Sequence, residues 1–199
     1  AIPINNFNTK FQSILFQTYG IIKKLIKTSN INMIGTISIA GIIKAKPEIH
    51  VAEKPKPLNP LIIDAINTHF KLSKQKPKFK GLLTTGNIDE KKIYAIKPLT
   101  FMNNSGTAIK ELIDYFKIDA KDVIVFHDDM DIDFGKIKAK FGGSSAGHNG
   151  IESIDKFIGK DYSRVRIGIG KPKDKMEVGD FVLQNFDEDE MLGLEKITN

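Results

Sequence analysis

Apolar residues recur at helical spacing near the start of the chain and then form one short continuous run. Between residues 7 and 27 they lie three or four positions apart, with lysines gathered near the end, which predicts an amphipathic helix. Residues 34–43 (IGTISIAGII) are short and rich in isoleucine, which predicts a buried strand. Four prolines within residues 44–60 then predict a loop.

From residue 61 onward, strand-like and helix-like segments alternate. Helical spacing predicts helices over residues 61–72, 104–117 and 149–157, and a last helix beginning near Asp187. Apolar runs predict strands over residues 79–85, 92–96, 123–126, 136–141 and 164–168, the first two joined by a turn centred on Asn87. This alternation predicts one α/β domain with a twisted mixed β-sheet flanked by helices on both faces.

The charge is distributed unevenly along the chain. Residues 1–80 hold 13 lysines and three acidic residues, a net charge of +10, whereas residues 81–199 hold 17 basic and 21 acidic residues, a net charge of −4. A lysine-rich surface attracts polyanions, and neutralisation of phosphates is the usual basis of nucleic-acid binding. A solvated surface in a lysine-rich chain explains the same numbers, so charge alone leaves both interpretations open.

The residue types exclude several kinds of chemistry. The chain has no cysteine, and hence neither disulfides nor a thiolate nucleophile. Its four histidines are widely scattered, so we expect neither a metal site nor a cofactor. The apolar runs are far shorter than the roughly 20 residues that cross a bilayer, and nothing resembles a signal peptide. We expect a soluble cytoplasmic protein with no membrane partner.

Three polar clusters follow predicted strands, where open α/β sheets place their ligands. The first is residues 100–106 (TFMNNSG), in which Asn103 can both donate and accept hydrogen bonds. Its side chain could fix a water or a carbonyl, or the asparagines could simply cap the next helix, and spacing alone favours capping.

The second cluster is residues 127–131 (HDDMD), directly after the strand over residues 123–126. Carboxylates beside a histidine can orient a catalytic imidazole or form an acidic, solvated turn. A metal would need more ligands than this run supplies. Its place at the end of a strand favours a site that includes Asp128.

The third cluster is residues 142–150 (GGSSAGHNG), which lead directly into a predicted helix. Small residues and a helix start can hold a phosphate or a ribose, with Lys140 and Arg166 completing an anion pocket. The pattern lacks the ending of a nucleotide phosphate loop and the glycine spacing of a dinucleotide site. The alternative is a flexible connector without a function. His148 and Asn149 at the helix start make a binding role and a connector equally favoured.

Three longer runs resemble bacterial-type peptidyl-tRNA hydrolase in order and spacing. They are KPLTFMNNSG (97–106), FHDDMDIDFGKIKAKFGGSSAGHNGIESI (126–154) and DYSRVRIGIGKP (161–172), and the resemblance extends from about residue 79 to 183. It implies a single-domain α/β enzyme, usually monomeric and metal-free, that cleaves the ester joining a peptide to the 3′ ribose of tRNA.

The resemblance also implies roles for individual residues. Asn103 contacts the peptide and helps to place the water, and Asp128 orients and polarises the catalytic histidine. His148 and Asn149 hold the carbonyl and the 3′-terminal groups of the substrate. Lys140 and Arg166 meet tRNA phosphates or stabilise charge.

The chain departs from the family where the general base is expected. Counting back from residues 61–64, the position of the family's catalytic histidine falls on or near Lys56, and His50 is a weak substitute. A lysine is protonated near neutral pH unless it is strongly desolvated. Three explanations are open: the chain binds RNA or tRNA without catalysis, it uses His50, or residues 1–60 differ from the true sequence. The last is favoured, because a specific downstream site makes little sense without its base.

The two ends of the chain also differ from the family pattern. Met33 lies where the family's chains normally begin, so we expect residues 1–32 to be an N-terminal extension and residues 33–199 to be the α/β domain. The chain ends before the family's closing helices. One hypothesis is that the predicted helix over residues 7–27 takes their place.

Overall fold

The computed structural model describes residues 17–21, 37–41, 58–133 and 136–171 of the chain. Several predictions concern segments outside these ranges: most of the helix over residues 7–27, the loop that follows residue 43 and the helix near Asp187. His50 and Lys56 also lie outside the described residues.

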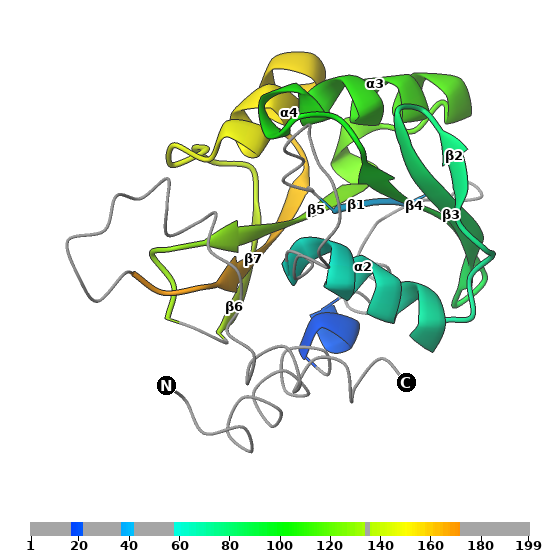
Figure 1. The fold of residues 1–199 in the computed structure, drawn as a ribbon, viewed down its shortest axis with the longest axis horizontal. Helices are drawn as coiled ribbons and strands as arrows, with labels where there is room; N and C mark the ends of the chain where they lie inside the picture. The colour runs from blue at the N-terminus through cyan, green and yellow to red at the C-terminus, as the bar shows by residue number, and fades with distance from the viewer. Residues whose placement is uncertain (1–16, 22–36, 42–57, 134–135, 172–199) are drawn as a thin grey trace, which may run out of the picture.

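Seven strands form one mixed sheet in the order β2-β3-β4-β1-β5-β7-β6 (Figure 1). The central pairs β4–β1, β1–β5 and β5–β7 are parallel, whereas β2–β3, β3–β4 and β6–β7 are antiparallel. The predicted mixed sheet is therefore confirmed. The strands are β1 (Ile37–Gly41), β2 (Lys76–Lys78), β3 (Gly81–Ile88), β4 (Lys91–Pro98), β5 (Val123–Asp129), β6 (Ile137–Phe141) and β7 (Ser163–Gly168).

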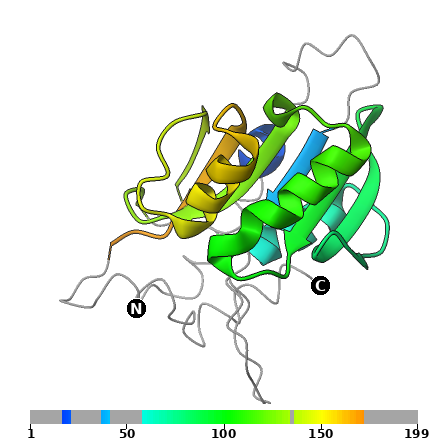
Figure 2. The ribbon, with the colours of Figure 1, turned by 90° about the horizontal axis from the view of Figure 1, so that it is seen from above.

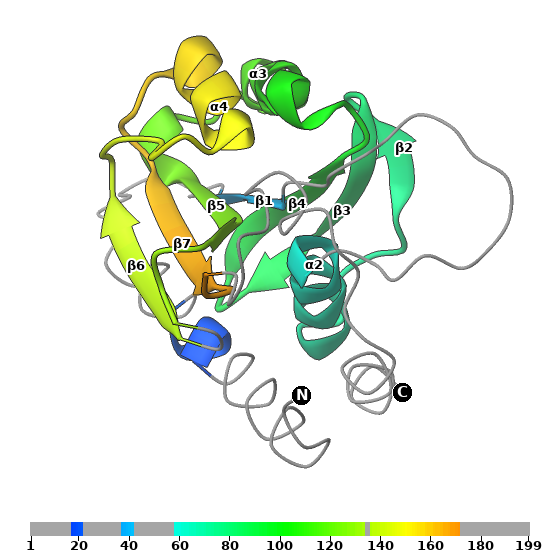
Figure 3. The ribbon, with the colours of Figure 1, turned by 60° about the vertical axis from the view of Figure 1, so that its left-hand side comes forward.

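Helices cover both faces of the sheet, as predicted. Helix α2 (Leu58–His69) lies on one face, and α3 (Ser105–Phe116) and α4 (Asn149–Ile158) lie on the other (Figure 3). Seen from above, α3 and α4 run side by side over the strands (Figure 2). Two short 3-10 helices precede α3 and β5: η1 (Met102–Asn104) and η2 (Ala120–Asp122). No described helix is both long and apolar enough to cross a membrane.

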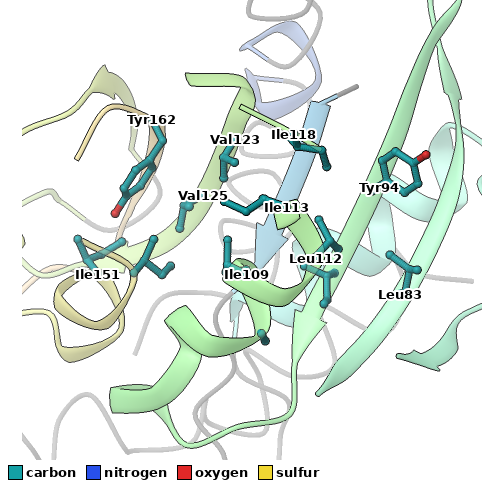
Figure 4. Packing of buried hydrophobic residues seen from close by; sticks show 13 residues of the cluster. Leu83, Tyr94, Ile109, Leu112, Ile113, Ile118, Val123, Val125, Ile151 and Tyr162 are labelled. Carbon is teal, nitrogen blue, oxygen red and sulfur yellow. The ribbon is translucent and has the colours of Figure 1, made fainter. Parts of the chain in front are cut away.

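Each face of the sheet has its own apolar core. Under α2, the cluster includes Ile62, Ile66 and Phe126, none of which has exposed surface. Under α3 and α4, a second cluster extends from Leu83 and Tyr94 on the hairpin strands to Tyr162, just before β7 (Figure 4). The sheet is thus buried on both sides, as expected for parallel strands.

Residues 17–21 are helical and pack against α2. The ring of Tyr19 stacks on that of His69 with 3.9 Å between centroids, and the Tyr19 hydroxyl donates to the carbonyl of Ala65 over 3.3 Å. This part of the predicted N-terminal helix therefore lies on the α2 face of the domain. Whether it takes the place of the family's closing helices stays a prediction, as does the boundary at residue 33.

The β3–β4 turn differs from the prediction. Asn87 lies within β3, paired with Lys92, and the turn is made by Asp89 and Glu90 at φ values of 46° and 67°. Two positive φ values characterise the tight turn that matches the twist of a hairpin. The prediction of a turn centred on Asn87 was wrong, because this turn usually carries asparagine or glycine and here carries two acids.

Two other boundaries moved for physical reasons. Helix α2 begins at Leu58, three residues before its predicted start, and includes Pro60 in its first turn. Proline is tolerated there because the first N–H groups of a helix have no partner within the helix. Strand β5 continues through Asp129, so the polar residues expected to follow the strand form its last three positions.

Candidate active site

Asp128 and His148 meet at the carboxyl end of β5. The Nε2 atom of His148 lies 3.4 Å from Oδ1 of Asp128, although the two residues are 20 positions apart in the chain. Their side chains are 14% and 12% exposed, so the pair is shielded but reachable from solvent. The sequence predicted both residues for the site, and the fold brings them together.

His148 is the N-cap of α4, and this role fixes its tautomer. Its Nδ1 atom accepts hydrogen bonds from the backbone N–H groups of Gly150 at 3.1 Å and Ile151 at 3.3 Å. A nitrogen that accepts two such bonds carries no proton, so the neutral ring has its hydrogen on Nε2. That hydrogen is donated toward Asp128. Two N–H groups expected to be open to an anion at this helix start are therefore used by the His148 ring.

His127 lies beneath this pair. It is 4% exposed, and its ring meets that of His148 edge to face, with 5.1 Å between centroids. Its Nδ1 atom lies 2.9 Å from the backbone carbonyl of Asp128. Burial, followed by repulsion from His148, lowers the pKa of His127 to about 4. His127 is therefore neutral near neutral pH.

Asn103 belongs to η1, which packs against α4. The start of α3, which directly follows η1, also contacts α4, since the N–H of Gly106 donates to Oγ of Ser153 over 3.0 Å. Asn103 itself is exposed and makes no side-chain cap bond to α3, whose N-cap position is held by Asn104. The spacing favoured a role for these asparagines in capping α3. Neither the Asn103 nor the Asn104 side chain makes a cap hydrogen bond to α3.

Four basic residues form a ladder on β7, which pairs with β5, and on the edge strand β6. In the β6–β7 register Lys138 is opposite Arg166 and Lys140 is opposite Arg164, and we call these four residues the basic ladder. Figure 1 shows β6 and β7 side by side at the edge of the sheet. Like charges directly opposite each other destabilise a sheet. An anion bound over these strands would reduce that repulsion.

Carboxylates neutralise only the β7 half of the ladder. Nε of Arg166 donates to Asp129 over 2.6 Å, and Arg164 pairs with Asp155 over 2.7 Å. Burial would raise the pKa of Asp129, but the hydrogen bond from Arg166 and one from the Asp131 N–H hold it below its ordinary value. Within the described ranges neither ladder lysine makes an ion pair.

Lys140 lies against the glycine-rich loop. Its Nζ atom is 3.5 Å from the carbonyl of Ser144, and a side chain at Gly143 would come within 2.9 Å of that Nζ atom. Gly143 has a φ of +99°, a conformation that glycine adopts without strain. Burial and the charges of Arg166 and Arg164 lower the pKa of Lys140.

A buried network holds the other side of the same loop. Arg164 has no exposed surface, and its guanidinium donates to the Ser144 carbonyl at 2.9 Å as well as to Asp155. The hydroxyl of Tyr162 donates to the same carboxylate over 2.7 Å, and burial raises the pKa of Tyr162. The loop that leads to His148 is thus fixed by an internal ion pair.

The last predicted site residue is Asn149, which directly follows His148. Asn149 is the first residue of α4 and is exposed. In the part of the chain that the structure describes, no three His, Asp or Glu side chains gather to hold a metal ion.

The sequence did not predict that His127 and Arg164 would lie against the site. Their only signals were a histidine at the end of a buried strand and an arginine alternating with Arg166, and each pattern is common in proteins without such roles.

Comparisons with known proteins agree with this geometry. The family model for peptidyl-tRNA hydrolase matches residues 58–199. A peptidyl-tRNA hydrolase of Pelagibacter ubique is 79% identical over 137 residues, which are 69% of this chain and 74% of the relative. One from Ehrlichia canis is 48% identical over 126 residues, 63% of this chain and 65% of the relative.

Solved structures give the same result. The crystal structure of peptidyl-tRNA hydrolase from Acinetobacter baumannii superposes with a TM-score of 0.70 at 28% sequence identity, covering 84% of this chain and 85% of that one. The resemblance noted in the sequence is therefore confirmed. The chain belongs to the peptidyl-tRNA hydrolase family.

Proposed function

We propose that this chain hydrolyses the ester bond between a peptide and the 3′ end of tRNA, releasing free tRNA and peptide. The observation that carries the proposal is the meeting of Asp128 and His148 beside the basic ladder, in a chain that is 79% identical to a peptidyl-tRNA hydrolase. A shielded carboxylate–imidazole pair suits ester chemistry, and a row of cations suits a polyanionic substrate.

The reaction requires a water to lose a proton as it attacks the ester carbonyl. We assign to Asp128 the role of orienting and polarising the imidazole that takes this proton. The charge that develops on the carbonyl oxygen needs fixed hydrogen-bond donors nearby.

Three side chains are assigned to the substrate's reacting end. Asn103 contacts the peptide portion and helps to place the water, using an amide that can donate and accept at once. His148 and Asn149 hold the carbonyl and the terminal ribose. In the tautomer described above, the Nε2–H of His148 faces Asp128, so His148 is not the proton acceptor. To hold the substrate carbonyl, this N–H would exchange its 3.4 Å contact with Asp128 for the carbonyl oxygen.

Lys140 and Arg166 are assigned to the phosphates of the tRNA. Both belong to the basic ladder, and Lys140 has a pKa lowered by burial and by the neighbouring guanidinium groups. A phosphate placed over these strands would relieve that repulsion. Each such contact releases condensed counterions, which makes binding sensitive to salt.

The general base stays unassigned, because His50 and Lys56 lie outside the described residues. The rival hypothesis, a non-catalytic RNA binder, gains no support from the relatives, which are named as hydrolases. We further propose that the protein acts as a monomer in the cytoplasm, with peptidyl-tRNA as its partner.

The experiment is a deacylation assay on purified protein. Peptidyl-tRNA is incubated with the chain, and the release of tRNA is followed alongside tRNA affinity. Asp128→Asn should reduce turnover by about 10²- to 10⁴-fold, the usual contribution of a positioned acid–base group, with little change in affinity. Asp131→Asn is the matched control, since Asp131 is exposed in the same segment and pairs with Lys171.

The two hypotheses separate clearly in this assay. Tight, salt-sensitive binding without any deacylation would reject the enzyme and support the binder. Deacylation that survives Asp128→Asn unchanged would remove Asp128 from the mechanism and leave the activity in place.

A further inference from the structure

Among the described residues, His127 is the one histidine near the site to which neither the resemblance nor the proposed function gives a role. It is buried at the end of β5, between the Asp128 backbone and the His148 ring. A buried histidine is most often a packing residue, so a further role needs an observation that packing does not explain. The hydrogen bonds of its two ring nitrogens provide one.

The Nδ1 atom of His127 must carry the proton. Its partner at 2.9 Å is the carbonyl of Asp128, and a carbonyl oxygen only accepts. In the neutral ring Nε2 is then an unprotonated acceptor. That Nε2 atom is buried and has no hydrogen-bond partner among the residues that the structure describes. His127 and His148 thus carry opposite tautomers, although their rings touch.

An unpaired buried acceptor is unfavourable, and an apolar ring of the same size would avoid it. Packing alone therefore does not explain a histidine at this position. What the imidazole adds over a phenyl ring is the Nδ1–H, and that group is directed at the backbone of the adjacent Asp128. The low pKa of His127 keeps this donor uncharged next to His148 across the neutral range.

We infer that His127 is a positioning residue for the Asp128–His148 pair: its Nδ1–H fixes the peptide plane of Asp128 and its ring supports His148 from below. The peptide plane determines where the Asp128 side chain leaves β5, and the carboxylate has to reach His148 at 3.4 Å. The edge-to-face contact limits rotation of the His148 ring about its own side chain. The inference rests on the proposed function only in the experiment that measures turnover.

Three variants separate the donor from the ring. His127→Asn keeps an N–H close to the position of Nδ1, His127→Gln moves the amide to the region of Nε2, and His127→Phe keeps the ring without the donor. We expect turnover to fall about 10- to 100-fold in the Gln and Phe variants with KM nearly unchanged, as for a misplaced catalytic group. The Asn variant should recover most of that loss. His69→Asn, in an exposed histidine on α2, is the control.

A second measurement does not depend on activity. Nitrogen-15 NMR of the imidazole rings in the wild-type protein should show His127 protonated on Nδ1 and His148 protonated on Nε2. In the Phe and Gln variants the Nε2 signal of His148 should shift because its contact with Asp128 changes, while the Nδ1 signal stays that of an acceptor held by the α4 N–H groups. In the Asn variant both signals should resemble the wild type. If the wild-type chain shows no deacylation, the proposed function fails while this measurement still tests His127.

Several results would overturn the inference. One is a His127 ring protonated on Nε2 in the wild type. Another is full turnover in the Phe variant, which would reduce His127 to packing. A third is an Asn variant as impaired as the Gln variant, which would show that the donor to Asp128 is irrelevant.

Discussion

Arg164 donates to the carbonyl of Ser144 across 2.9 Å, and so a residue with no exposed surface on β7 holds the loop that leads to His148. The same guanidinium is neutralised by Asp155 on α4. Strand, loop and helix are therefore joined through one buried charge. Because the pair is desolvated, removing either Arg164 or Asp155 alone would leave a buried charge without a partner.

The first prediction concerns this pair. Arg164→Met leaves the Asp155 carboxylate buried without a cation and should lower the free energy of unfolding by about 3–5 kcal/mol, measured by urea denaturation. Lys110→Met breaks the exposed pair with Asp114 and should cost no more than about 1 kcal/mol. Equal losses in the two variants would contradict the buried role of Arg164.

The second prediction is a pH dependence of stability. The pKa of His127 is about 4 in the folded chain and near its ordinary 6.5 when unfolded, so the unfolded state binds the extra proton first. The stability that depends on a neutral His127 is fully present above pH 6.5 and is lost as the pH falls toward 4. Over that window the free energy of unfolding should fall by about 3 kcal/mol. His127→Phe should flatten this part of the profile. A wild-type curve with the same slope as the variant would show that His127 is not buried as a neutral ring.

The third prediction tests the basic ladder through salt. Lys140→Ala should raise KM for peptidyl-tRNA and reduce the slope of log affinity against log salt concentration by about 1, since one phosphate contact is removed. Lys121→Ala is the control, because Lys121 is exposed and pairs with Asp119 away from the ladder. An identical salt slope in wild type and Lys140→Ala would exclude a phosphate contact at this lysine.

The fourth prediction compares two glycines. A methyl group at Gly106 would lie 2.4 Å from the Ser153 carbonyl oxygen and 2.6 Å from the ring of Phe157, so Gly106→Ala should force the start of α3 away from α4 and cost about 1–3 kcal/mol. At Gly20, which is helical, nothing lies within 4 Å, and Gly20→Ala should stabilise by about 0.5–1 kcal/mol. Thermal unfolding of both variants checks the opposite signs.

Strands with apolar runs were predictable, and strands without them were not. Residues 123–126 are continuously apolar and fully or almost fully buried, so the pattern identified β5. Strand β2 was missed, because Lys76, Pro77 and Lys78 are all exposed and carry no apolar signal. Lysine and proline are typical of an edge strand, where they discourage pairing with another chain. Only the presence of β3 beside it makes this segment a strand.

The sequence identified two residues that the fold brings into contact, but it did not predict their geometry. Asp128 and His148 stood out through motifs that resemble a known family, and the fold places them in contact. Their tautomers depend on which backbone groups lie opposite each ring nitrogen, and a sequence does not contain that information. The same holds for Arg164, whose burial follows from the way α4 and the glycine-rich loop close over β7.

Strand β1 lies between two halves of the sheet whose strands come much later in the chain: Ile37 pairs with Ile93, and Ser38 with Val123. Closing loops of this length costs entropy before any pairing energy is gained, which makes its docking a slow step. Until it docks, β4 and β5 each present an open apolar edge that a second unfinished chain could occupy. The yield of active protein should therefore depend on concentration during refolding, because correct insertion of a five-residue segment competes with aggregation.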